Sequence, residues 1–238
     1  MVLKPIQTKH TIYYSPYDSD YDPQILDMVV EICSVNFPEL LKNKITIINS
    51  PANTSPFCYF DKSRILLCSK ENHFCQLVYQ FAHELLHYSL TQQANNNLHW
   101  FEEALCEMNS HYVLNKLSAP QSITNFLDSY NYRHNFKDYS LETLENCVAI
   151  SIPDIPTSYQ HIISYPYSHR DELRYIAKQM LPIFLEYPEL FEYIQAMKIF
   201  NSQDIIEDFE FSIQRLGISK SIMLLRSIFT KWYLSLQC

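Results

Sequence analysis

Residues 74–90 read FCQLVYQFAHELLHYSL and contain the pentapeptide His83-Glu84-Leu85-Leu86-His87. The stretch lacks glycine and proline, and its apolar residues recur at helical spacing, which predicts a helix with one buried stripe. His83 and His87 lie four residues apart and therefore project from one face of that helix, roughly opposite the stripe and toward a cleft. Two imidazoles so placed can bind one metal ion, and Glu84 is positioned to take a proton from a water molecule that the metal activates.

A second helix is predicted where residues 100–107 read WFEEALCE, because apolar residues again fall on one face. The polar, Asn-rich connection over residues 91–98 suits a loop, so the two helices can run antiparallel. Glu103 is then a candidate third metal ligand, which leaves the fourth position of a catalytic zinc open. Glu107, one turn further along, is placed to accept a hydrogen bond from the outer nitrogen of a ligand histidine.

Other interpretations of the same residues stay open. His99 at the start of the second helix would give a three-histidine site, and the acidic residues there would otherwise form a solvated face that the helix dipole favours. Cys106 is expected to be a small packing residue. The metzincin pattern fails, since it requires Gly and His where Leu90 and Gln93 stand.

HExxH followed by Trp-x-x-Glu-Ala-x-x-Glu resembles the gluzincin metallopeptidases, which include thermolysin-like enzymes, their aminopeptidase relatives and compact single-domain forms. The resemblance covers roughly residues 55–115. It implies Zn²⁺ and hydrolysis of a peptide or protein substrate, with histidine ligands His83 and His87, general base Glu84, glutamate ligand Glu103 and a supporting carboxylate at Glu107. Glu102 stands where the family has Asn, and the Ala after Glu103 favours Glu103 over Glu102 as the ligand.

The resemblance also implies a Tyr or His that stabilises the oxyanion opposite the base. Residues 165–170 read YPYSHR and precede a predicted helix. Tyr167 is the preferred candidate, with Tyr165 and His169 as alternatives. The competing interpretation is packing, the usual role of tyrosine in a chain with 18 of them.

The fold class predicted is α+β. We expect a small antiparallel or mixed sheet whose edge strand packs on the HExxH helix and can hold an extended substrate, followed by a mostly helical C-terminal lobe, in a zincin-like arrangement. The lobes are predicted at residues 1–118 and 119–238, within one structural unit. The predicted strands are Thr11–Tyr14, Lys44–Asn49, Phe57–Phe60 and Arg64–Cys68; further helices are predicted from Asp22 and over residues 171–181 and 219–236.

Composition limits the function classes. A formal net charge of −8 argues against a nucleic-acid partner. No apolar run is long enough to cross a membrane, and seven scattered cysteines suggest reduced thiols in a cytoplasmic protein. The single glycine leaves turns to Asn, Asp, Ser and Pro. The sequence therefore predicts an active zinc peptidase, and the alternative is a binding or regulatory protein that keeps the fold and the metal.

Overall fold

The computed structural model of the chain describes residues 5–17, 22–50, 52, 54–59, 63–90, 99–119, 132–147 and 168–194. The chain divides into two compact units. The first comprises Met1–Gln92 and Asn109–Glu145, and the second comprises Gln93–Met108 and Asn146–Cys238. The helix α3 (His99–Ser118) is continuous and contributes residues to both units.

The first unit contains a five-stranded mixed sheet in the order β1-β2-β3-β5-β4. β3 lies in the middle and is parallel to both β2 and β5, whereas β1 and β4 run antiparallel to their neighbours at the two edges. The strands are β1 (Ile6–Gln7), β2 (Thr11–Tyr14), β3 (Ile45–Asn49), β4 (Phe57–Tyr59) and β5 (Arg64–Leu67). The α+β class and a mixed sheet are confirmed, and each of the four predicted strands lies within one residue of its expected bounds.

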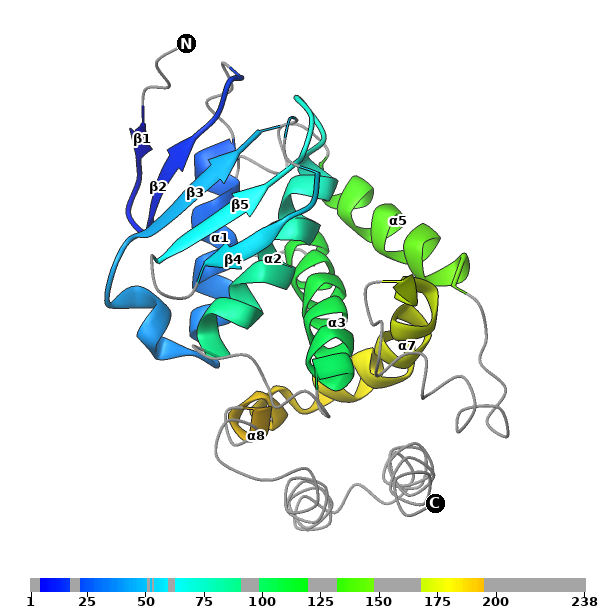
Figure 1. Ribbon diagram of the computed structural model, residues 1–238. Helices are drawn as coiled ribbons and strands as arrows, with labels where there is room; N and C mark the ends of the chain where they lie inside the picture. Colours follow the sequence, from blue (N-terminus) through cyan, green and yellow to red (C-terminus); the bar gives the residue numbers. More distant parts are fainter. Residues whose placement is uncertain are drawn as a thin grey trace. The chain divides into compact units, whose positions relative to one another are not determined.

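Helices cover one face of this sheet. α1 (Asp22–Ser34) connects the parallel strands β2 and β3, and α2 (Phe74–Leu90) contacts β4, β5 and α1. Figure 1 shows α1 and α2 on the same side of the sheet. Alternate strand residues such as Tyr13, Ile47 and Ile65 are buried toward these helices, as the two-residue period of a strand requires.

α2 is buried on nearly all sides, which differs from the expected helix with a single buried stripe. Its polar residues Gln80, His83 and His87 are buried along with the apolar ones. The polar side of α2 also faces neighbouring elements. Gln80, for example, accepts a hydrogen bond through its Oε1 from the backbone N–H of Cys68, just after β5, at 3.0 Å. The sheet and α1 cover part of α2, and α5 (Tyr132–Glu145) contacts it as well, so little of α2 meets solvent.

Two turns are built on left-handed residues other than glycine. Ser63, directly before β5, has φ 47°, and Asn72, two residues before α2, has φ 60°. A left-handed residue with a Cβ costs on the order of 1 kcal/mol, least for Asn, and the fold accepts this cost at both positions. The expectation that Asn and Ser replace glycine in turns is confirmed at these two positions.

The described part of the second unit beyond α3 is helical. It contains α7 (Arg170–Glu186), a 3-10 turn η5 (Pro188–Leu190) and the short α8 (Phe191–Ile194). The helix predicted over residues 171–181 continues through Pro182, an exposed residue, and ends at Glu186. The helix predicted over residues 219–236 lies outside the described residues. Within the described ranges, every helix is too short or too polar to cross a membrane.

The connection between β1 and β2 is held by one carboxylate of α1. Asp27 accepts hydrogen bonds from the Thr8 hydroxyl at 2.6 Å and from the backbone N–H groups of Lys9 at 3.0 Å and His10 at 3.1 Å. Glu31, one turn along α1, contacts the Lys9 ammonium at 2.9 Å, and both of these side chains are largely in water. Asp27 therefore ties the sheet edge to α1, whereas Glu31 makes a surface ion pair.

We predict that Asp27→Ala lowers the free energy of unfolding by about 1–3 kcal/mol, because two backbone donors and one hydroxyl lose a charged acceptor. Urea denaturation followed by circular dichroism measures the loss. Glu31→Ala is the matched control and should cost less than about 1 kcal/mol, as a solvent-exposed pair does. Equal losses in the two variants would show that Asp27 is no more than a surface partner.

Candidate metal centre

Two side chains of α3 donate hydrogen bonds to backbone carbonyls of α2 within the first unit. Asn109 Nδ2 donates to the Ala82 carbonyl at 2.7 Å, and Ser110 Oγ donates to the Tyr79 carbonyl at 2.9 Å. The chain advances along α3 as it recedes along α2, so the two helices pair antiparallel, as predicted.

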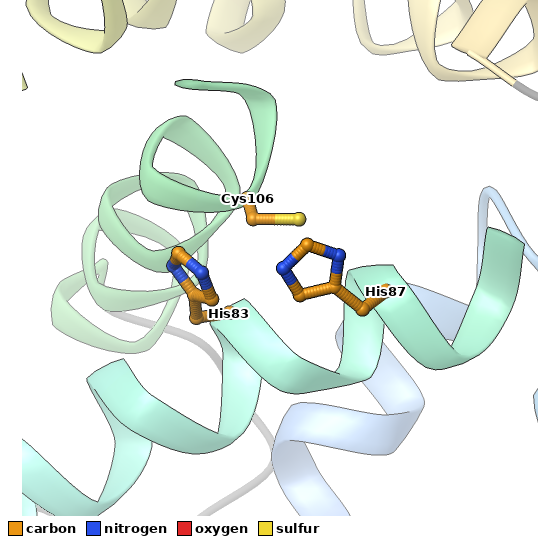
Figure 2. A group of neighbouring side chains, drawn as sticks. All are labelled: His83, His87 and Cys106. Carbon is orange, nitrogen blue, oxygen red and sulfur yellow. The ribbon is translucent and has the colours of Figure 1, made fainter. Parts of the chain in front are cut away.

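Cys106 is one helical turn before Asn109, and this antiparallel pairing places it opposite the histidine pair. One donor atom from each of His83, His87 and Cys106 lies within 4.8 Å of the others. The imidazole rings are 5.2 Å apart between centroids and inclined at 62°. Figure 2 shows the two rings on α2 turned toward each other and the Cys106 sulfur extending from α3 above them. All three side chains are buried.

This donor set suits zinc. Imidazole nitrogen and thiolate sulfur are ligands that zinc prefers, at about 2.0–2.1 Å and about 2.3 Å respectively. A tetrahedral ion with these bond lengths holds its donors roughly 3.3–3.7 Å apart. The separations here extend to 4.8 Å, so side-chain rotations that move the donors by about 1 Å would complete the geometry. The three residues therefore fit the metal that the HExxH pattern implies.

The third member of the cluster is a cysteine, whereas the gluzincin resemblance implies a glutamate. Cys106 was expected only to fill space, and the structure places it in the candidate metal centre. A clue was present in the sequence, because Cys106 lies three residues after Glu103 and therefore on the same face of α3 as the predicted ligand. The ligand role of Glu103 stays a prediction.

The acidic residues of α3 are buried, so the interpretation as a solvated face is wrong. Glu102, Glu103 and Glu107 are each at most 7% exposed. His99 lies beside two of them, with Nε2 3.7 Å from a Glu103 oxygen and Nδ1 4.0 Å from a Glu102 oxygen. Among the described residues, His99 is not part of the His83, His87 and Cys106 group.

Glu84, the predicted base, is also buried on α2. It lies three residues before His87, so helical geometry directs both side chains to neighbouring positions on the helix surface. Buried Glu residues are rare in a core helix unless they have a partner. A buried carboxylate close in sequence to two imidazoles is therefore unusual. Its role as a base stays a prediction.

Glu107 forms an ion pair within the second unit. Arg174 on α7 donates from Nε to Glu107 Oε1 at 2.9 Å, and its Nη1 donates to Asp171 at 3.1 Å. The Glu107 side chain is 2% exposed and the Arg174 side chain 24%. The guanidinium therefore supplies positive charge to a carboxylate that is otherwise removed from water. The sequence suggested a role for Glu107 but not for Arg174, since the two are 67 residues apart.

The oxyanion candidates are described only in part. Tyr165 and Tyr167 lie outside the described residues. His169 occupies the N-cap position of α7, where its Nδ1 is 3.1 Å from Glu172 Oε1 in the first turn of the same helix. A local contact of this kind is typical of a helix start, and it gives His169 a structural role at that position.

The cluster could hold a divalent metal ion through nitrogen and sulfur donors, with several buried carboxylates on the same two helices. Comparisons of the chain with protein-family models, with curated proteins and with solved structures find no match in any of the three. The function is therefore inferred from the chemistry of the site itself.

We predict that Arg174→Met lowers the free energy of unfolding by about 1–3 kcal/mol, because the buried Glu107 carboxylate loses a charge-assisted hydrogen bond. Thermal unfolding by calorimetry provides the measurement. Asp171→Ala removes the more exposed partner of the same arginine, and we expect it to cost less than about 0.5 kcal/mol. The interpretation fails if Arg174→Met is as stable as Asp171→Ala.

Proposed function

We propose that this chain is a zinc-dependent metallopeptidase of the gluzincin type, with a zincin-like fold. One observation carries the proposal: buried donors of His83, His87 and Cys106 lie within 4.8 Å of one another, on the helix whose sequence also supplies Glu84. A structural metal site has no need of a carboxylate between its histidines, whereas a hydrolytic site needs a base there.

His83 and His87 would hold the ion from α2, and α3 would complete the site from the face that carries Glu103 and Cys106. When bound, zinc supplies Lewis acidity that lowers the pKa of water and polarises a carbonyl group. Imidazole and thiolate donors favour zinc over magnesium or calcium, which prefer oxygen ligands. Zn²⁺ is therefore the cofactor that we propose.

Glu84 would move the proton. A carboxylate at this position accepts a proton from the attacking water and returns it to the departing amine, so one residue serves both halves of amide hydrolysis. Burial supports this role, because a base with restricted access to bulk water keeps the proton within the site. Glu107, held by Arg174, is proposed to support a ligand histidine, and Tyr167 is proposed to stabilise the oxyanion.

The edge strand β4 is the proposed place for an extended peptide or protein substrate. β4 pairs with β5 on one side only and contacts α2, the helix that carries the histidines. Phe57 on this strand is 44% exposed and packs edge-to-face on Tyr59 at 4.9 Å between ring centroids. A peptide that adds to such an edge gains backbone hydrogen bonds with little sequence preference.

The second candidate function is a metal-binding regulatory protein without hydrolytic activity. The burial of all three donors and the presence of a cysteine favour it, because closed zinc sites with cysteine ligands are commonly structural. The two functions make opposite predictions for Glu84, which matters to a peptidase and is dispensable for a metal-binding protein.

We predict that Glu84→Gln keeps bound zinc and reduces peptide hydrolysis by at least about a hundredfold, the contribution typical of a general base. Zinc content is measured by mass spectrometry, and hydrolysis with a library of fluorogenic peptides. Glu145→Gln, at the C-terminal end of α5, is the control and should keep both properties. A wild-type protein that binds zinc but cleaves no peptide would favour the regulatory alternative.

We also predict that Glu103→Ala loses most of its zinc, because the variant lacks a ligand that the gluzincin pattern requires. Glu102→Ala is the matched control, one residue away and also buried, and should retain the metal. Dialysis against a weak chelator followed by metal analysis gives the comparison. Full zinc content in Glu103→Ala would remove Glu103 from the ligand set.

A further inference from the structure

Cys106 belongs to the candidate metal centre, yet neither the HExxH pattern nor the gluzincin resemblance assigns it a role. We propose that the Cys106 thiolate is a direct zinc ligand in the third-ligand position that the gluzincin pattern gives to Glu103, so that His83, His87 and Cys106 hold the ion and the fourth position stays open. Under this proposal Glu103→Ala keeps its zinc, so the Glu103→Ala comparison above distinguishes the two ligand sets. This inference deepens the proposed function and depends on it only for the presence of zinc. It does not require that the chain hydrolyse anything.

The position of Cys106 follows from the backbone. Asn109 and Ser110 fasten α3 to carbonyls of α2, and Cys106 is one turn before Asn109 on the same helix. Its sulfur comes within 4.8 Å of a nitrogen of each histidine. A residue that only filled space would not need to turn a polarisable donor atom toward two imidazoles, as Figure 2 shows for this one.

Two other cysteines, the buried Cys33 and the half-buried Cys75, differ from Cys106 in their surroundings. None of the six described cysteines is in a disulfide. Burial raises the pKa of Cys33 to about 12 and that of Cys75 to about 11, so both remain protonated thiols at neutral pH. Neither joins a group of metal-binding side chains among the described residues, whereas Cys106 does. Cys106 is therefore the described cysteine best placed to bind a metal.

Binding of the ion at this residue is a simple exchange. A zinc–sulfur bond forms as the thiol S–H bond breaks, the proton leaves to solvent, and zinc stays divalent with no oxidant or reductant involved. A thiolate adds negative charge and a soft donor to two neutral imidazoles. Both properties favour zinc over the magnesium, calcium and manganese ions that carboxylate sites accept.

X-ray absorption of the zinc-loaded wild-type protein tests the ligand without any mutation. With one equivalent of zinc, we expect one sulfur at about 2.3 Å beside nitrogen or oxygen ligands at about 2.0–2.1 Å. Cobalt(II) in place of zinc should give a thiolate-to-cobalt charge-transfer band in the near ultraviolet. Because both measurements report the ligands themselves, they are independent of peptidase activity.

Two variants assign the sulfur. Cys106→Ser should lose the cobalt band and weaken zinc binding by more than about tenfold, the smallest effect expected even of an outer partner. Cys75→Ser, on α2 itself, is the matched control and should keep the band and the affinity. Circular dichroism establishes that each variant is folded.

The possible results separate the two proposals. Zinc bound without sulfur in the wild-type protein would overturn the role of Cys106 and leave the proposed peptidase with nitrogen and oxygen ligands. A sulfur signal that persists in folded Cys106→Ser would also overturn it. A protein that binds neither zinc nor cobalt would overturn the metallopeptidase proposal together with this one.

Discussion

The antiparallel pairing of α2 and α3 is the constraint on which the candidate site depends. It is fixed by side chains of α3 that donate to main-chain carbonyls of α2, at Asn109 and Ser110. A hydrogen bond to a backbone carbonyl fixes the position of the helix itself, whereas a bond between two side chains can be lost by rotation. The residues one turn along the helix are therefore held in position too. Cys106 gains its position opposite His83 and His87 in this way, and rigid helices give a metal site the precision it needs.

The same two helices carry an unusual amount of buried ionisable chemistry. His83, Glu84, His87, Glu103 and Glu107 are all buried, at positions where a core helix would ordinarily place apolar residues. Burying charge is costly unless an opposite charge or a metal compensates it. Arg174 provides that compensation for Glu107. A divalent cation bound by His83, His87 and Cys106, as proposed above, would add positive charge beside these buried groups.

The helices and strands were predictable because the spacing of apolar residues that identifies them lies within each short segment of sequence. The β-branched and aromatic runs gave strands such as Thr11–Tyr14 and Arg64–Leu67 almost to the residue, and the apolar spacing gave α2 over Phe74–Leu90. The mistakes concern surroundings. α2 was expected to bury a single stripe, and a solvated face was the alternative for the acidic residues of α3. Both sets of residues are buried, since the sequence does not tell which faces of a helix other elements will cover.

The sequence by itself determined the pair of imidazoles on one helix face and the carboxylate between them, because a spacing of four residues fixes their directions in any helix. It also determined the α+β class, because segments whose apolar residues recur at helical spacing are found together with segments of strand-like composition. Only the tertiary structure decided that Cys106 meets the histidines and that Arg174 pairs with Glu107. Those contacts join residues far apart in the chain, and they depend on how helices pack, which no local spacing encodes.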